Sequence, residues 1–421
     1  MSLLRIVLKN LRQRALSSAL TSFSIALGVA VVVAILTLQT QSHAAFSQSA
    51  VGYDLIVGPR GSPLQLVLVT VFHLDELQST IPYSVYKELE KDRRVRTAVP
   101  VVVGDTYQGH RLVATTPQLL TALEFMPGRK FELAAGRFFE SSEDAVDHLM
   151  QTESHDHDHG NLKFEAVVGS SAARSTGLAV GSTFKATHGL AEGKAHEELW
   201  TVTGVLRPTG SPADRAIFIN LESFMATGDH AKAASEEKDR RGRISSVIVI
   251  TRGGRAADDL RYDFQNRPEA MAVQPAKEIH AFFELIGNID KLLLAVSVLV
   301  ILVAGVSILV SIYNSMSERK RPIAILRALG ARRTTILSII LLEATTLCLF
   351  GGLAGVAAGH GLAEAAGRVL GAQAGVSVTG WAFHPLEAAV IGGLMILGVL
   401  VGLLPAFKAY RSDISRGLNP S

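Results

Sequence analysis

The sequence from Ser317 to Ala344 reads SERKRPIAILRALGARRTTILSIILLEA and separates two apolar runs that are each long enough to cross a bilayer. Charged side chains enter the hydrocarbon core only at a large cost in free energy, so this connection must lie at one side of a membrane. Its part from Ser317 to Arg333 has a single carboxylate, Glu318, and six basic residues, which are Arg319, Lys320, Arg321, Arg327, Arg332 and Arg333. The positive-inside rule therefore predicts that the connection is cytoplasmic.

The same connection has the pattern of a short amphipathic helix. Pro322 suits the first turn of a helix and Gly330 suits its C-terminal cap. Ile323, Leu326 and Leu329 fall on one face at helical spacing. A cytoplasmic helix with an apolar stripe and a basic face requires a partner that covers the stripe.

Apolar residues are concentrated in a few runs of this 421-residue chain, which is 48% hydrophobic and only 19% charged. Four runs reach the roughly 20 residues that a helix needs to cross a bilayer. They are Leu16 to Leu38, Leu292 to Tyr313, Ile336 to Leu362 and Leu386 to Phe407. The net charge of +3 is small and its basic residues lie beside these runs, so we do not expect nucleic-acid binding.

The first run is interpreted as an uncleaved membrane anchor. It follows the basic residues Arg5, Lys9, Arg12 and Arg14, as a signal peptide would, but its apolar core exceeds the roughly 7 to 15 residues of a signal sequence. The preceding LLRIVLKNLRQR predicts an amphipathic helix along the inner interface, or alternatively an extension of the first span.

These observations predict a membrane α-helical protein with four transmembrane helices and both termini cytoplasmic. A large α+β extracytoplasmic domain is inserted between helices 1 and 2. The expected divisions are residues 1–40 for the interfacial helix and first span, 41–285 for the outer domain, and 286–421 for the remaining spans. Short β-rich runs support the α+β assignment. They are Asp54 to Val57, Ala98 to Val103, Arg111 to Ala114, Glu165 to Gly169, Glu198 to Leu206, Ala216 to Leu221 and Ser245 to Thr251.

Several motifs resemble the FtsX-like, MacB-type permeases of ABC transporters, the mechanotransmission class. The connection after Ser317 is similar to the family pattern ER-x-REI-x-x-LRALGA. The C-terminal GLLPAFKAYRSDISRGLNP is similar to the family's C-terminal sequence, except that Ile414 stands where the family usually has proline. Within the outer domain, VVGSSAARSTGLAVGSTF and TGSPADRAIFINLESF also resemble the family. The stretch DLIVGPRGSPLQLVLVTVFHL resembles a branch of the family associated with zinc-responsive genes. The alternative is a generic amphipathic hinge at the membrane surface, since Leu64, Leu68 and Val71 have helical spacing.

The resemblance implies that the basic connection is a coupling helix that docks on an ABC ATPase. The residues it assigns to this contact are Glu318, Arg319, Arg321, Ile323, Leu326, Arg327, Leu329 and Gly330. No G-x-x-x-x-G-K-[ST] sequence occurs, so the ATPase is expected to be a separate subunit and the chain itself non-catalytic. The implied assembly is two permeases, as a homodimer, with two ATPases in the inner membrane, the large domain facing the periplasm. The alternative is a membrane scaffold that recruits and controls an extracytoplasmic partner, such as a metal-binding or adaptor protein.

The sequence HLMQTESHDHDHG contains four histidines interleaved with carboxylates, which are the ligands that Zn²⁺ prefers. His148, His155, His157 and His159 are therefore candidate zinc ligands, with a solvated acidic loop as the alternative. His188, His196 and His230 are further candidates that nothing in the sequence places nearby.

Polar and small residues within the third run predict helix packing. Glu343 is costly in a membrane, and we expect a structural role rather than a proton relay. Gly355 and Gly359 form G-x-x-x-G, a spacing that permits close helix contact and suits a subunit interface.

Overall fold

The computed structural model describes residues 3–75, 77–142, 146–147, 162–188, 195–227, 242–318, 330–374 and 378–411. The chain divides into two compact units. The helical unit comprises Met1–Ser42, Ile286–Val369 and Val378–Ser421. The sheet unit comprises His43–Leu285 and Leu370–Ser377.

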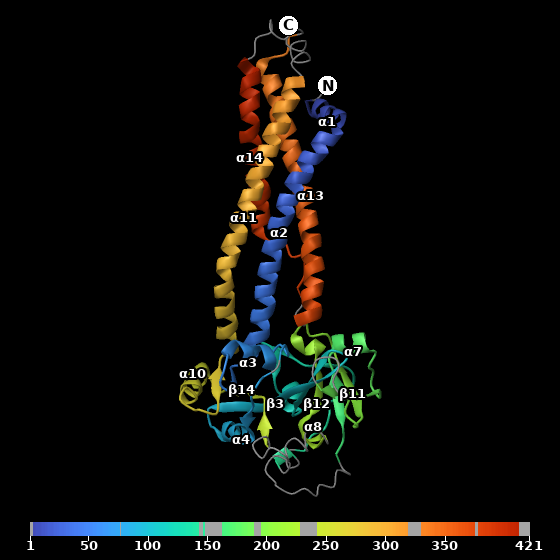
Figure 1. Ribbon diagram of the computed structural model, residues 1–421, viewed down its shortest axis with the longest axis vertical. Coiled ribbons are helices and arrows are strands. Elements are labelled where there is room, and N and C mark those ends of the chain that lie inside the picture. Colours follow the sequence, from blue (N-terminus) through green and yellow to red (C-terminus); the bar gives the residue numbers. More distant parts are fainter. Residues whose placement is uncertain are drawn as a thin grey trace. The chain divides into compact units, whose positions relative to one another are not determined.

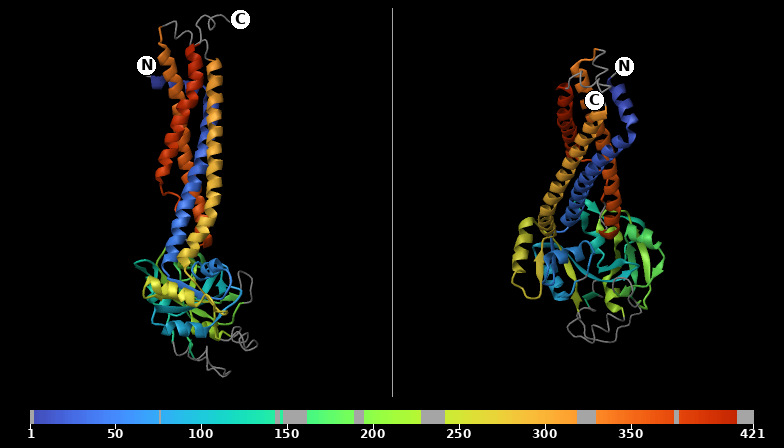
Figure 2. Two further views of the ribbon diagram at one scale, coloured as in Figure 1. Left: turned by 90° about the vertical axis from the view of Figure 1, so that its left-hand side faces the viewer. Right: turned by 45° about the horizontal axis from the view of Figure 1, so that its top comes forward.

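Helices make up the described part of the helical unit, and they are α1 (Leu3–Gln13), α2 (Ala15–Val51), α11 (Pro275–Glu318), α13 (Arg333–Ala374) and α14 (Pro385–Arg411). Figures 1 and 2 show the long helices α2, α11, α13 and α14 running alongside one another, with the short α1 at the N-terminal end. Pro275 and Pro385 stand at the first positions of α11 and α14, where proline fits because no backbone donor is needed there. Many apolar side chains on α2, α11, α13 and α14 are exposed, as expected for surfaces that face lipid.

Three of these helices are long and apolar enough to cross a membrane, counted over the residues that the structure describes. The segments are Ala15–Ser49, Thr334–Gly371 and Pro385–Leu403. The fourth predicted span, Leu292 to Tyr313, lies within α11, but only the shorter stretch Val298–Val310 is identified there as apolar helix. The number of four spans is therefore not confirmed, and the second span stays a prediction.

Eleven of the described strands of the sheet unit form one mixed sheet, in the order β15-β1-β14-β3-β4-β12-β8-β11-β7, with β10 beside β3 and β9 beside β11. The pairs β11–β8 and β12–β4 are parallel and the other pairs are antiparallel. The bounds are β1 Leu55–Gly58, β3 Val95–Tyr107, β4 His110–Thr115, β7 Leu133–Gly136, β8 Glu165–Val168, β9 Thr183–Phe184, β10 Thr187–His188, β11 Trp200–Leu206, β12 Ile217–Asn220, β14 Ser246–Thr251 and β15 Met271–Val273.

Short helices and two small ladders complete the described part of this unit. The ladders pair β2 (Ile81–Pro82) with β13 (Arg243–Ile244) and β5 (Glu124–Met126) with β6 (Arg129–Lys130). The helices are α3 Pro63–Thr70, α4 Tyr83–Lys91, α5 Gln118–Thr121, α7 Ser170–Thr176, η2 Pro212–Arg215, α8 Leu221–Ala226 and α10 Gly254–Asp263.

The sheet is buried on both faces. Along β14, Val247 and Val249 pack in one hydrophobic cluster, whereas Ile248 and Ile250 pack in another. Successive side chains of a strand point to opposite faces, so the two clusters lie on opposite sides of the sheet. This double burial explains why the strands are nearly continuous apolar runs that could be recognised in the sequence.

Candidate functional site

A β-bulge in β3 places the first residue of a polar cluster. Val103 packs in one hydrophobic cluster, while Tyr107 packs against the cluster on the other face. Residues four apart on a regular strand face the same side, so the strand must reverse its faces between them. The pairing of β3 with β4 is indeed irregular between Val103 and Thr106. Asp105 lies inside this irregularity, and bulges are a common means of redirecting a side chain.

Two histidines reach Asp105 from segments that pair with each other. β10 pairs with β3 so that His188 stands opposite Asp105. Beyond β10, Ala195 forms an antiparallel bridge with Thr187, and the backbone N–H of His196 donates to the carbonyl oxygen of Ala186 at 2.9 Å. Backbone pairing therefore fixes the position of each of the three residues.

The three side chains converge on one point. Asp105 Oδ1 lies 3.0 Å from Nδ1 of His188, and Asp105 Oδ2 lies 3.0 Å from Nε2 of His196. The two imidazole centroids are 4.3 Å apart with the rings inclined at 62°. One potential ligand atom from each residue lies within 4.8 Å of the others. Two imidazoles and a carboxylate in this arrangement can share protons or bind a borderline divalent cation.

The cluster is closed on one side and open on the other. The side chains of Asp105 and His196 are 2% and 0% exposed, whereas that of His188 is 44% exposed. Tyr107 packs against Phe184 with ring centroids 4.9 Å apart, which supports the segment leading into β10. Solvent therefore reaches the cluster through His188.

The structure does not test the histidine-rich segment. His148, His155, His157 and His159 lie outside the described residues, as does His230. The sequence indicated His188 and His196 as candidate zinc ligands but did not show that they lie near each other. It did not indicate Asp105 as a ligand. A lone aspartate within an apolar strand was the only available signal for it.

Most of the predicted coupling residues also lie outside the described residues, namely Arg319, Arg321, Ile323, Leu326, Arg327 and Leu329. Glu318 is the last residue of α11. Gly330 has a φ of 96°, a conformation that favours glycine and suits the turn before α13.

The glycines of α13 lie against α2 of the same chain. A methyl group added at Gly355 would lie 2.6 Å from Cβ of Val29 and 2.7 Å from the carbonyl oxygen of Ala26. One added at Gly359 would lie 2.7 Å from Cβ of Val33. This face of α13 therefore makes the predicted close helix contact with α2 of the same chain, and a role of these glycines at a subunit interface stays a prediction. Glu343, on the same helix, is buried, with 8% of its surface exposed.

A second polar cluster joins α13 to the start of α14. His360 Nδ1 lies 2.6 Å from the carbonyl oxygen of Gly380, and its Nε2 lies 3.0 Å from Glu387 Oε2. Glu387 Oε1 also accepts a hydrogen bond from the backbone N–H of His384 at 2.8 Å. The imidazole and the carboxylate are both buried, so this cluster ties α13 to the first turn of α14.

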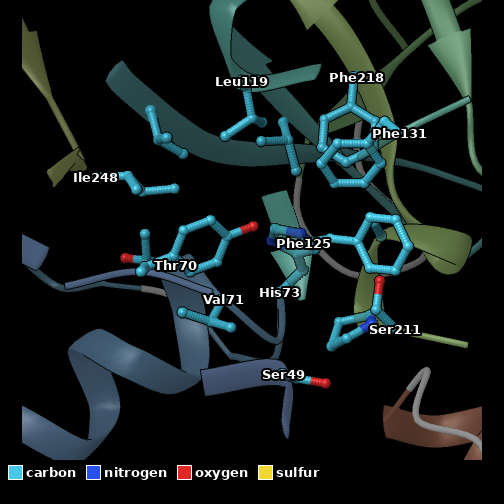
Figure 3. A pocket seen from close by; sticks show the side chains of 15 residues that line it. Ser49, Thr70, Val71, His73, Leu119, Phe125, Phe131, Ser211, Phe218 and Ile248 are labelled. Carbon is cyan, nitrogen blue, oxygen red and sulfur yellow. The ribbon is translucent and has the colours of Figure 1, made fainter. Parts of the chain in front are cut away.

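The sheet unit also contains a small cavity, shown in Figure 3. Its volume is about 20 Å³, room for roughly one water molecule. Phe125, Phe131 and Phe218 form its apolar side, and His73 lies at the cavity with a pKa lowered to about 4 by burial. The cavity is too small for an organic cargo.

Comparison with known protein families locates two matches along the chain. Residues 18–267 match the MacB-like periplasmic core domain, and residues 294–414 match the FtsX-like permease C-terminal region. The first match alone covers more than half of the chain.

Individual relatives are similar over shorter stretches. A macrolide export ATP-binding/permease protein MacB from Rhodopirellula baltica is 35% identical over 128 residues, which are 30% of this chain and 18% of that protein. An uncharacterized ABC transporter permease YknZ from Bacillus subtilis is 30% identical over 200 residues, 47% of this chain and 46% of that protein. The chain thus spans less than half the length of either relative.

The periplasmic region of MacB from Actinobacillus actinomycetemcomitans is similar at 14% identity and a TM-score of 0.34, over 55% of this chain and 94% of that structure. The two family matches, one over the sheet unit and one over the later helices, account for most of the described structure. The chain belongs to the family of ABC transporter permeases that combine a MacB-like periplasmic core domain with an FtsX-like permease C-terminal region.

Proposed function

We propose that this chain is the membrane subunit of an inner-membrane ABC transporter complex, and that it couples ATP hydrolysis by a separate subunit to movement of the sheet unit in the periplasm. The observation that carries this proposal is the continuity of α11. This helix begins at Pro275, two residues after β15 of the sheet, and runs uninterrupted to Glu318 at the start of the basic connection. One helix therefore connects the last strand of the sheet along the chain to the basic connection.

Close packing among the long helices supports the same proposal. A methyl group added at Gly28 of α2 would lie 2.9 Å from Val300 Cγ1 of α11, and one added at Gly305 of α11 would lie 3.2 Å from Leu397 of α14. A methyl group at Gly398 of α14 would lie 2.5 Å from Sγ of Cys348 on α13. Small residues thus let the helices approach closely, and a tightly packed unit moves as one body.

Leu326→Asp tests the coupling contact. A carboxylate placed in the predicted apolar stripe opposes burial against the ATPase, because an unpaired charge is costly to desolvate. We expect the variant permease to fold and reach the membrane but to lose most of its stimulation of ATP hydrolysis in nanodiscs that contain both subunits. Ala324→Asp is the matched control, since position 324 lies on the opposite face of the predicted helix. Equal stimulation by Leu326→Asp and the unmodified chain would favour a scaffold that recruits a periplasmic partner.

The topology is tested by labelling with an impermeant thiol reagent. Cys348 is first replaced, and single cysteines are introduced at Ser317 and Ser154. In spheroplasts the cysteine at 154 should react and the one at 317 should react only after the membrane is permeabilised. The reverse pattern would contradict the proposed orientation.

Two further proposals rest on the sequence. A second copy of the permease completes the assembly, and the segment containing His148, His155, His157 and His159 binds Zn²⁺ in the periplasm. The support for the second is the interleaving of imidazoles with carboxylates. It links the complex to metal handling or to a metal-binding partner protein.

A further inference from the structure

We propose that Asp105, His188 and His196 form a Zn²⁺ site in the sheet unit, distinct from the histidine-rich segment and independent of the coupling mechanism. The donor set is appropriate for zinc, which binds neutral imidazole nitrogen and carboxylate oxygen. Zinc bound at 2.0–2.1 Å in a tetrahedron separates neighbouring ligand atoms by about 3.3 Å. The two nitrogen–oxygen distances of 3.0 Å, one to each oxygen of Asp105, are close to that separation. One ligand atom from each residue lies within 4.8 Å of the others, so rotation of the side chains would draw them around the ion.

The site is held by backbone pairing. His188 is in register with Asp105 across the β3–β10 ladder, and the N–H of His196 is bound to the carbonyl oxygen of Ala186. Residues already ordered by strand pairing lose little conformational entropy when they bind an ion. This distinguishes the cluster from ligands on a loop, which must be ordered at the moment of binding.

Burial supplies both a reason for binding and an entry path. Asp105 is almost completely buried, and a buried carboxylate is stabilised by a cation beside it. The 44% exposure of His188 leaves one side of the cluster open to solvent. Three protein ligands with an open fourth position describe a site in which water or an incoming group completes the coordination.

Bound zinc would join three segments of the sheet unit. It would connect the bulge of β3, the end of β10 and the segment that begins at Ala195. An ion that binds only the folded form raises the stability of that form by mass action. Zinc should therefore raise the unfolding temperature of the sheet unit as well as occupy the site.

The test uses the full chain purified in detergent, with His148, His155, His157 and His159 all replaced by alanine so that the histidine-rich segment does not contribute. After removal of metal by a chelator, the protein is equilibrated with ZnCl₂, desalted and analysed by elemental mass spectrometry. We expect about one zinc per chain, lost when His188→Ala is added. His280→Ala is the matched control, because His280 is an exposed histidine on α11 of the same unit. It should retain the zinc.

A spectroscopic measurement separates loss of ligands from loss of folding. Co²⁺ in place of zinc should give the visible absorption of a four-coordinate site in the chain that retains His188. This absorption should disappear in the variants His188→Gln and Asp105→Asn. Both variants keep side chains of similar size. Absence of zinc from the chain with the intact cluster, or unchanged zinc content in His188→Ala, would show that the three side chains are only a hydrogen-bonded cluster.

Discussion

Gly355→Val is expected to destabilise the helical unit more than any other single substitution considered for this chain. The valine would meet Cβ of Val29 at 2.6 Å and the carbonyl oxygen of Ala26 at 2.7 Å, so α13 and α2 must separate. Overpacking of a tight contact costs about 3 kcal/mol at the upper end of its usual range. Thermal unfolding of the detergent-solubilised chain should show a clearly lower midpoint and a lower yield of folded protein.

Gly361→Val provides the control on the same helix. Gly361 is exposed, and an added methyl group there would have no neighbouring atom within 4 Å. Both substitutions place a β-branched residue in α13, so they share the small change in helix propensity. If the two variants unfold at the same temperature, the close contact between α13 and α2 is not a source of stability.

Asp214→Ala is expected to be the most damaging substitution in the sheet unit. The Asp214 carboxylate accepts hydrogen bonds from the backbone N–H of Thr209 at 2.9 Å, from the Thr209 hydroxyl at 2.9 Å and from the N–H of Gly210 at 2.8 Å. Alanine would leave these donors without their acceptor in a buried turn, at a cost of about 3 kcal/mol. Chemical denaturation of the full chain, followed by tryptophan fluorescence, should show the transition of the sheet unit at lower denaturant concentration.

A surface carboxylate serves as the comparison for Asp214. Asp258 forms an exposed ion pair with Lys277 at 3.1 Å. Exposed pairs contribute little to stability because water screens both charges. Asp258→Ala should therefore shift the transition little, and an equal shift in the two variants would refute the importance of the turn built on Asp214.

The strands that the sequence predicted from short apolar runs are confirmed by the structure. The run Ser245 to Thr251 predicted a strand, and β14 covers Ser246–Thr251. The predicted strands at Asp54, Ala98, Arg111, Glu165, Glu198 and Ala216 likewise correspond to β1, β3, β4, β8, β11 and β12. Each is an apolar run of strand length bounded by turn residues, and burial on both faces of the sheet requires such a run. The predicted number of spans is not confirmed, because among the described residues of α11 only Val298–Val310 is found as an apolar helix.

By itself, the sequence determined which segments are strands and long helices and which family they form, because apolar periodicity, charge placement and short motifs are local properties of the chain. Only the tertiary structure decided which distant residues meet. Asp105 joins His188 and His196 because β3 is irregular and β10 pairs with it in one register. Gly355 contacts α2 because of how the helices of one chain pack. Strand register and the choice of helix partner are set by the free energy of the whole packed arrangement, and no local pattern in the sequence records them.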